Sequence, residues 1–312
     1  MLSDRWDAPL PEIRYNLSMS VALIHKKPSE LQDVPTTNGI YIFRSGKTPV
    51  YIGKSVNLKA RLVSHIENAK KDPKEAAIIE AADNIDWIIT DSEFKALILE
   101  SQLIQKYLPK YNVRWRDDKS YLYIKATVKD EYPKFFITRR EEDKKSLYFG
   151  PFPSVVVATN ILREIRKVFP FCSQKRITNR KCFYAKIGMC NPCPNDIEKL
   201  EDKTQKIKEK KEYRKNIRNV IRILEGKIDP VVDQLYKEIN KLIKEEKYEE
   251  AIPYRNRIYR LESVVLRRKF GNDTNEYNIS ETRVDSLFKL LSPHFPELNS
   301  VDRIECFDIS HT

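Results

Sequence analysis

The stretch GIYIFRSGKTPVYIG, residues 39–53, decides the fold of this chain. Two short runs rich in β-branched and aromatic residues, 39–43 and 50–53, enclose a segment that contains Gly46 and Pro49. Apolar runs of this length on either side of turn-forming residues predict a β-hairpin. They are the first clear core signals, because residues 1–33 are expected to be irregular and carry several prolines.

Helical and extended patterns alternate after the hairpin. Residues 57–63 have apolar side chains at helical spacing behind a capping Asn57, and 85–90 has the composition of a strand. A longer helix is predicted over 92–108 and a strand pair over 121–128 and 134–138. Together they predict a small α+β domain with a central mixed or antiparallel sheet and flanking helices. The expected apolar face of the long helix comprises Phe94, Leu97, Ile98, Ile104 and Tyr107.

Beyond residue 153 the pattern is mostly helical. We predict helices over 155–168 and within 196–226, then an antiparallel helical hairpin from 231–246 and 249–268. The final apolar stretch, 304–309, predicts a strand that could not form a core alone, so a truncated ending is expected. The expected units are 1–33, an N-terminal extension; 34–115, the first domain; 116–170, a strand pair and linking helix; 171–228, a cysteine-rich and basic helical segment; 229–270, the helical hairpin; and 271–312, a linker with the final strand.

The chain is basic. In 312 residues, 57 Lys and Arg stand against 45 Asp and Glu, a net charge of +12. Counterion release from phosphates rewards such surfaces, so nucleic acid is the favoured partner, with a ribosome-associated or merely lysine-rich protein as the alternative. No apolar run approaches the ~18 residues of a membrane span. Residues 1–20 also lack the apolar core of a signal peptide, so we expect a cytoplasmic protein.

Four polar residues in and after the hairpin could carry phosphodiester chemistry. Tyr41 and Tyr51 lie ten residues apart, Arg61 lies ten further on, and Glu100 lies in the long helix. Hydrolysis of a phosphodiester needs an activated water, a positive group that stabilises the transition state and usually a metal ion. Tyr, Arg and Glu can supply these in that order, although each residue alone is more often structural.

In this order and spacing the residues resemble the GIY-YIG nuclease signature, and Asn112 stands where that family has an Asn at the domain end. The resemblance implies a metal-dependent DNA endonuclease with a single-metal mechanism. Glu100 would hold Mg²⁺ or Mn²⁺, Tyr41 would activate the attacking water, and Asn112 would brace the site.

The implied role of Tyr41 requires its pKa, ordinarily near ~10, to fall. Lys54 and Arg61 are expected to lower it, and Arg61 also to stabilise the transition state. Tyr51 would orient the phosphate or the water. The last expected catalytic residue is His65. DNA-repair nucleases with this signature usually have a Tyr at that position.

Three further segments resemble landmarks of one branch of these nucleases, the UvrC family of excision-repair endonucleases. They are YNV at 111–113, RDDKSY at 116–121 and YFGPFP at 148–153, in that family's order. The resemblance runs from about residue 34 to the end. It implies incision of a damaged strand on the 3′ side of a lesion, with DNA and UvrB as partners and UvrA as an indirect one.

Four of the five cysteines fall between residues 172 and 193. In a reducing compartment such clustering favours a metal site over disulfides, and thiolates bind zinc or an iron–sulfur cluster. The spacing does not choose between the metals. The segment also resembles the cysteine region of the UvrC family, which implies an iron–sulfur cluster, with Zn²⁺ as the alternative. The expected ligands are Cys172, Cys182, Cys190 and Cys193.

The helical hairpin over 231–261 resembles the UVR motif, through which the UvrC family docks on UvrB by helix-against-helix packing. Pro253 departs from the motif and is awkward beyond the first turn of a helix. The basic run at 203–222 predicts a solvated helix face, with a DNA phosphate track as the alternative. The last residues resemble the start of an RNase H-like domain, with Asp308 at its first metal position. The expected partner-binding residues are Leu235, Ile239, Tyr248, Glu249, Ala251 and Arg255.

Two other functions stay open. A non-catalytic, metal-stabilised adaptor that binds DNA and UvrB would keep this fold without cutting. A stand-alone repair nuclease like Cho would share the first domain but lack the helical hairpin, and residues 231–261 argue against it.

Overall fold

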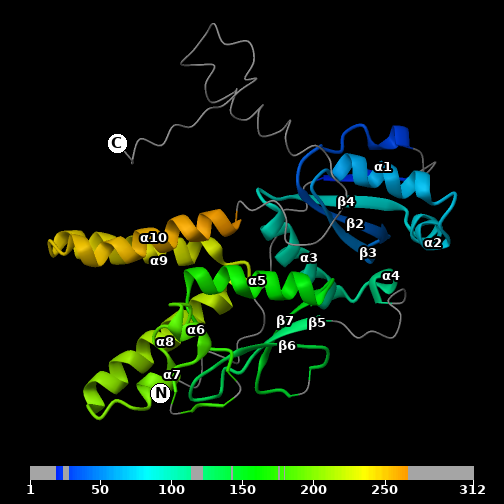
Figure 1. The fold of residues 1–312 in the computed structure, drawn as a ribbon. Coiled ribbons are helices and arrows are strands. Elements are labelled where there is room, and N and C mark those ends of the chain that lie inside the picture. Colours follow the sequence, from blue (N-terminus) through cyan, green and yellow to red (C-terminus); the bar gives the residue numbers. More distant parts are fainter. Residues whose placement is uncertain are drawn as a thin grey trace, which may run out of the picture. The chain divides into compact units, whose positions relative to one another are not determined.

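A computed structural model describes residues 19–23, 28–113, 122–141, 143–174, 176–178 and 180–265. Its first sheet has four antiparallel strands in the order β1-β4-β2-β3 (Figure 1). The predicted hairpin is confirmed: β2 (Gly39–Ser45) pairs with β3 (Thr48–Ser55). β4 (Asn84–Ile89) pairs with the other side of β2, and β1 (Met19–Ala22) pairs with β4.

The expectation that residues 1–33 are irregular is wrong for two segments. β1 adds a strand to the sheet, and a 3-10 helix, η1, covers Pro28–Leu31. Leu23 and Leu31 are buried in the same core as the hairpin. Elements of four residues are too short for periodicity to reveal, since pairing and packing with the rest of the sheet stabilise them.

Two helices pack together beside the first sheet. α1 (Leu58–Asn68) begins as predicted at Asn57, whose side chain accepts the Ala60 N–H. α2 (Pro73–Ala81) was not predicted, although a capping Asp72 followed by proline is a start signal. Both helices bury apolar side chains in the core that contains Tyr41.

The long helix α3 (Glu93–Tyr107) begins at the capping Ser92. The expectation of a single apolar face is wrong, because α3 serves two cores. Phe94, Leu97 and Ile98 pack with the second sheet, whereas Ile104 packs with β2 and β3, and Tyr107 is 40% exposed. A helix covered on two sides shows no single apolar stripe. The short helix α4 (Lys110–Val113) follows.

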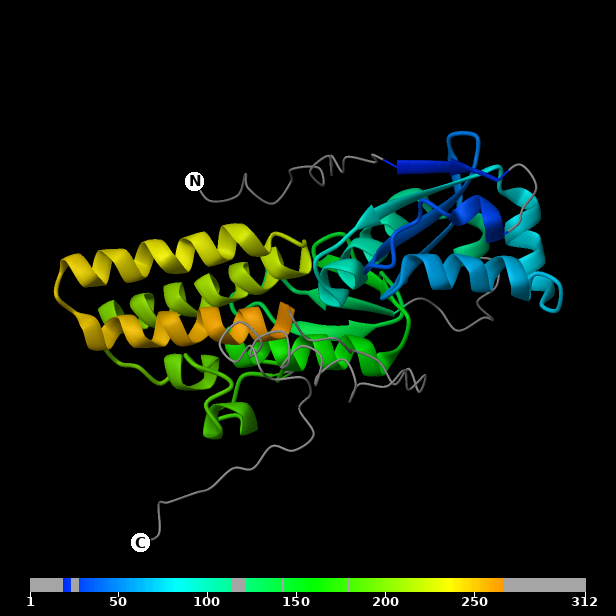
Figure 2. The same ribbon diagram turned by 90° about the horizontal axis from the view of Figure 1, so that it is seen from above.

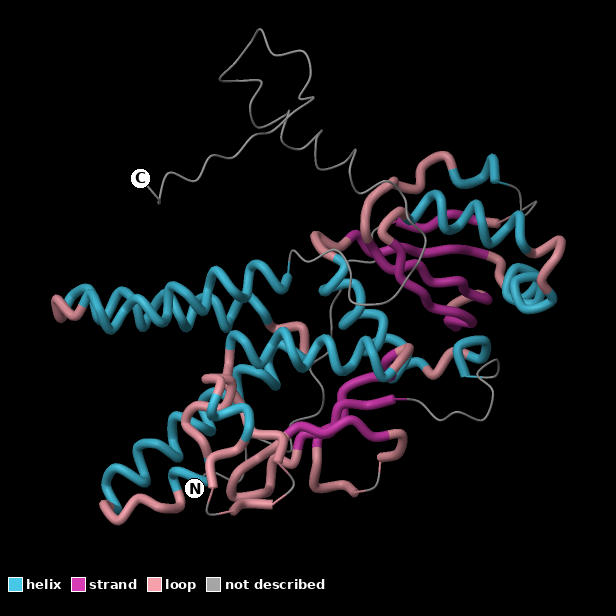
Figure 3. Tube along the Cα trace, in the orientation of Figure 1, coloured by secondary structure: helices cyan, strands magenta, loops and turns pink. Residues whose placement is uncertain are grey.

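A second antiparallel sheet has the order β6-β5-β7 and appears in Figure 3 as a separate group of strands. The two predicted strands are present as β5 (Leu122–Ala126) and β6 (Phe135–Thr138). β7 (Leu147–Phe152) was missed because its Gly-Pro pair indicates a turn. The helix α5 (Val155–Val168), with its predicted bounds, contacts all three strands.

The remaining described elements are helices. α6 (Phe183–Lys186) and α7 (Pro194–Ile197) lie in the cysteine region, and α8 (Lys203–Leu224) follows them. α9 (Ile228–Lys244) and α10 (Tyr248–Val265) lie side by side as the predicted hairpin (Figure 2). Pro253 lies inside α10, beyond its first turn. The proposed landmark at 116–121 and the final strand with Asp308 lie wholly outside the described residues.

Several basic side chains of α8 are engaged by neighbouring elements. Lys210 pairs with Glu131, and Lys215 Nζ lies 2.8 Å from Glu238 Oε1. Lys208, in contrast, is exposed. None of the helices in the described ranges combines the length and apolar character that a membrane crossing requires.

Candidate functional site

Tyr41 lies in the middle of β2 and is 1% exposed. Its partner across the hairpin is Gly53. A Cβ atom at Gly53 would come within 2.3 Å of the Tyr41 hydroxyl oxygen, so only glycine leaves room for the ring. Gly53 in β3 therefore leaves the space that the Tyr41 side chain of β2 occupies.

The Tyr41 hydroxyl is the centre of a hydrogen-bonded chain. It lies 2.8 Å from His65 Nε2, and Arg61 Nε donates to its oxygen at 3.3 Å. The other ring nitrogen of His65, Nδ1, bonds to the carboxylate of Glu75. Because a carboxylate accepts, Nδ1 carries the proton and Nε2 accepts from Tyr41. The chain thus runs from Arg61 through Tyr41 and His65 to Glu75.

Burial dominates the electrostatics of this chain. It raises the pKa of Tyr41 well above its ordinary value, and Arg61 opposes this rise without cancelling it. Burial also lowers the pKa of His65, although the bond from Glu75 works against that change. The expectation of a lowered Tyr41 pKa is therefore wrong, because loss of hydration outweighs the neighbouring guanidinium. Both groups are neutral near pH 7.

Lys54 makes two contacts with carboxylates of α3. Its ammonium lies 3.0 Å from Glu93 Oε1, and its backbone N–H donates to Glu100 Oε1 at 3.2 Å. After burial, the largest influences on the pKa of Tyr41 are Tyr51 and Glu100, which raise it, and Arg61, which lowers it. Lys54 thus positions Glu100 through the backbone and pairs with a second carboxylate of α3.

Tyr51 lies in β3 with its ring centre 6.2 Å from that of Tyr41. Burial and then Glu100 raise the pKa of Tyr51. Next to it, Ile52 bonds with both of its backbone groups to the Asn112 side chain: the amide N–H donates to Oδ1 and the carbonyl accepts from Nδ2, each at 2.8 Å. Since β3 is an edge strand, Asn112 replaces a missing neighbour strand.

The structure therefore gathers the expected catalytic residues around one end of the hairpin, and it adds one that sequence analysis missed. Glu75 comes from α2, and its side chain is 12% exposed. The only signal was its place after Asp72-Pro73, which indicates a helix start and gives no hint of contact with His65.

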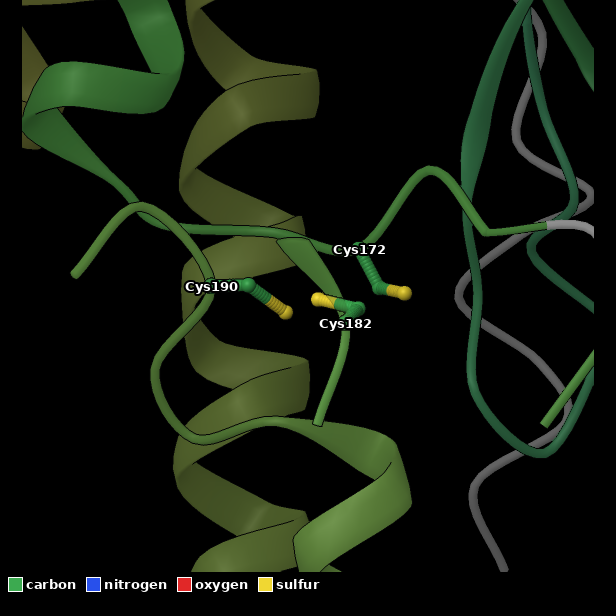
Figure 4. Close-up of side chains that lie close together, drawn as sticks. All are labelled: Cys172, Cys182 and Cys190. Carbon is green, nitrogen blue, oxygen red and sulfur yellow. The ribbon is translucent and has the colours of Figure 1, made fainter. Parts of the chain in front are cut away.

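The four clustered cysteines form a second candidate site. The sulfur atoms of Cys172, Cys182 and Cys190 lie within 4.8 Å of one another, and Cys193 Sγ lies 3.8 Å from Cys182 Sγ. Figure 4 shows the first three converging from separate segments. All four are buried. Asn216 of α8 fixes the surrounding loops by donating to the carbonyls of residues 170 and 191.

The thiols of this cluster are unequal. Bonds from the Cys190 thiol lower the pKa of Cys172 to about 6 and that of Cys193 to about 5, whereas the pKa of Cys190 is raised. The buried Lys134, next to β6, also lowers the pKa of Cys172. Thiolates so stabilised suit a soft metal ion or an iron–sulfur cluster.

The expected partner-binding residues of the helical hairpin are split. Leu235 and Ala251 are buried within this chain, and the partly buried Ile239 packs against its core. Their contact with a partner stays a prediction. α9 contacts α8, and α10 contacts α3 and α5. Tyr248, Glu249 and Arg255 are exposed. The exposed apolar residues of the hairpin are Tyr236, Ile243, Tyr248, Ile252 and Tyr259.

An antiparallel hairpin with two tyrosines, an arginine on the following helix and a glutamate on a long helix defines the GIY-YIG class. The family model of the UvrC-like GIY-YIG domain matches residues 37–113, and the family model of the UvrC/Cho excinuclease middle domain matches residues 121–222. The chain belongs to the UvrC family.

Relatives in this family are UvrABC system proteins C. The protein from Thermoanaerobacter sp. is 36% identical over 250 residues, which cover 77% of this chain and 39% of the relative. The one from Methanococcus maripaludis is 33% identical over 80% of this chain and 45% of its own length. The chain thus spans less than half the length of these relatives. A solved structure, the magnesium-bound GIY-YIG domain of UvrC from Thermotoga maritima, is 40% identical over 27% of this chain and 93% of that chain, with a TM-score of 0.26.

Proposed function

We propose that this chain is a metal-dependent DNA endonuclease that cuts a damaged strand on the 3′ side of a lesion. The observation that carries the proposal is the buried chain from Arg61 through Tyr41 and His65 to Glu75, beside Glu100. The family relation supports the substrate: its UvrABC relatives act in a system that would supply the lesion-bearing complex of DNA with UvrB, loaded by UvrA.

Catalysis would start at the Tyr41 hydroxyl. Its raised pKa excludes a standing phenolate near pH 7, so the proton must have somewhere to go when the attacking water is activated. The Tyr41 oxygen accepts a proton from that water while its own proton moves to Nε2 of His65. Glu75 stabilises the resulting imidazolium, and Arg61 stabilises charge on the oxygen and on the phosphate in the transition state.

Glu100 would hold the divalent cation, Mg²⁺ or Mn²⁺. Oxygen ligands suit these hard cations, and Glu100 acts electrostatically on both Tyr41 and Tyr51, so its carboxylate belongs to the same site. When bound, such an ion polarises a phosphate oxygen. Lys54 keeps Glu100 in place through its backbone N–H, and Tyr51 would orient the water or the phosphate.

The test is strand incision on a lesion-bearing duplex loaded with UvrA and UvrB, labelled at each end in turn. Wild type and the exposed control Glu67→Ala should make the 3′-side nick, and Glu100→Ala should lose it by at least about 100-fold. Equal cutting by Glu100→Ala would overturn the mechanism. Binding of the loaded complex without any cutting would support the adaptor function instead.

For the cysteine cluster we propose an iron–sulfur cluster, with Zn²⁺ as the alternative. Four buried thiols, two of them with a lowered pKa, provide a complete ligand set for either. Visible absorption together with iron, sulfide and zinc content of protein purified without oxygen distinguishes them. Equimolar zinc without iron would overturn the first choice.

We propose that the helical hairpin, as a UVR-type motif, docks on UvrB through the exposed apolar side chains of Tyr248 and Ile252. Tyr248 is 61% exposed and Ile252 is 44% exposed on the same helix. An unpartnered apolar surface of this kind suits helix packing with another protein. Tyr248→Ala should weaken binding to UvrB in a titration, whereas Lys237→Ala on α9 should not.

A further inference from the structure

We propose that a basic groove between α5 and α10 binds the phosphate backbone of DNA at a site separate from the residues around Tyr41. The groove has a volume of about 940 Å³. Its walls are the end of α5, the loop at 187–189 and the second half of α10. The inference rests on the proposed function only in taking DNA as the ligand.

Arg166 gives the groove its specificity for an anion. Its side chain is 6% exposed, and its guanidinium carbon lies 4.3 Å from the ring centre of Phe171 and 3.9 Å from that of Tyr184. Its buried Nε has no hydrogen-bond partner, and no carboxylate among the described residues forms an ion pair with it. The two rings hold the guanidinium in place and offset part of its desolvation. A buried charge without a counterion still requires an anion.

Basic residues outnumber acidic ones in the rest of the groove. Lys167, Arg257 and Arg260 line it, and Glu164 is the one acidic residue among its lining. Arg257 Nη1 also lies 3.9 Å from Glu212 Oε1, outside the lining. Both oxygens of Glu164 already accept from Lys167 Nζ at 2.9 Å. The net positive charge of the lining therefore favours a ligand with several phosphates.

Tyr259 favours nucleic acid over an acidic segment of a protein. It lines the groove and is 63% exposed, so its ring and hydroxyl are available to the sugar next to a bound phosphate. A guanidinium fork matches phosphate geometry. The apolar residues of the lining, among them Ile187 and Met189, lie beside these basic side chains.

The experiment is equilibrium binding of the 312-residue chain to a fluorescent duplex in excess EDTA, so that cutting does not contribute. Arg260→Glu is the main variant, because Arg260 is exposed and only donates to the carbonyl of residue 167. Arg166→Gln is the second, with its fold checked by circular dichroism. Lys208→Glu, an exposed residue of α8, makes the same charge change outside the groove.

We expect Arg260→Glu to bind at least about tenfold more weakly at low salt, with the slope of log K against log salt reduced by about one. Lys208→Glu should stay within about twofold of wild type. Equal weakening by both would overturn the proposal in favour of net charge alone. Unchanged binding by Arg260→Glu would also overturn it and leave the groove to an acidic protein segment. Neither result bears on the proposed nuclease activity, which the Glu100→Ala incision experiment tests.

Discussion

The Tyr41 hydroxyl forms hydrogen bonds with Arg61 and His65 of α1, and His65 in turn bonds to Glu75 of α2. Glu75→Gln keeps the shape but removes the charge that fixes the His65 tautomer. We expect the incision rate to fall by about 10- to 100-fold with little loss of stability. Incision under single-turnover conditions measures it, with the exposed Glu67→Gln as control. An unchanged rate in Glu75→Gln would mean that His65 accepts no proton.

The buried His65 also makes stability depend on pH. Its folded-state pKa is lowered, so below about pH 6.5 the unfolded chain binds a proton that the folded chain does not. The free energy of unfolding therefore falls as the pH falls, until the pH reaches the folded-state pKa. Urea unfolding at about pH 7.5 and 5.5 should show a larger loss for wild type than for His65→Gln, which cannot titrate. Equal losses would contradict this.

At the scale of elements, α4 secures the open edge of the first sheet through Asn112. Asn112→Ala would leave the N–H and C=O of Ile52 without this partner. We expect a loss of about 1–3 kcal/mol in the free energy of unfolding. Asn68→Ala, at the exposed end of α1, should change it by no more than about 0.5 kcal/mol. Thermal and urea unfolding of both variants provide the comparison.

The cysteine region is the second element whose stability comes from few residues. Its helices are short, and Asn216 of α8 bonds to the loops around it. Removing the proposed metal with a chelator, or one proposed ligand with Cys190→Ser, should lower the melting temperature and expose 171–200 to protease. An unchanged melting temperature after complete metal loss would show that the thiols pack without help.

At the scale of the molecule, α3 joins the two halves of the described chain. Its residues belong to the core of the first sheet and to the core that includes the second sheet, α5 and α8 to α10. Ile98→Ala, on the second of these faces, should cost about 2–5 kcal/mol. Hydrogen exchange should rise in β3 as well as in α8, because α3 is shared. The exposed Val56→Ala is the control, and exchange confined to α8 would show that the halves unfold independently.

Much of the local structure could be predicted. The hairpin, the Asn57 cap, α5 and the α9–α10 pair follow from periodicity and capping, which depend on neighbouring residues. β1, α2 and β7 were missed because short elements, or those with turn residues, gain their stability from distant partners. The sequence pattern predicted one apolar face for α3 instead of two, because the two cores that α3 contacts are built by distant residues.

The sequence by itself determined the class of this protein, because the spacing of two tyrosines, an arginine, a glutamate and four cysteines is a local record of the chemistry. Only the tertiary structure decided how Tyr41 is charged and what surrounds it. Burial raises its pKa, Glu75 reaches His65 from another helix, and Lys54 turns to Glu93. It also buried Leu235 and left Arg166 without a counterion among the described residues. Desolvation and contacts between distant residues exist only after folding, so no pattern along the chain records them.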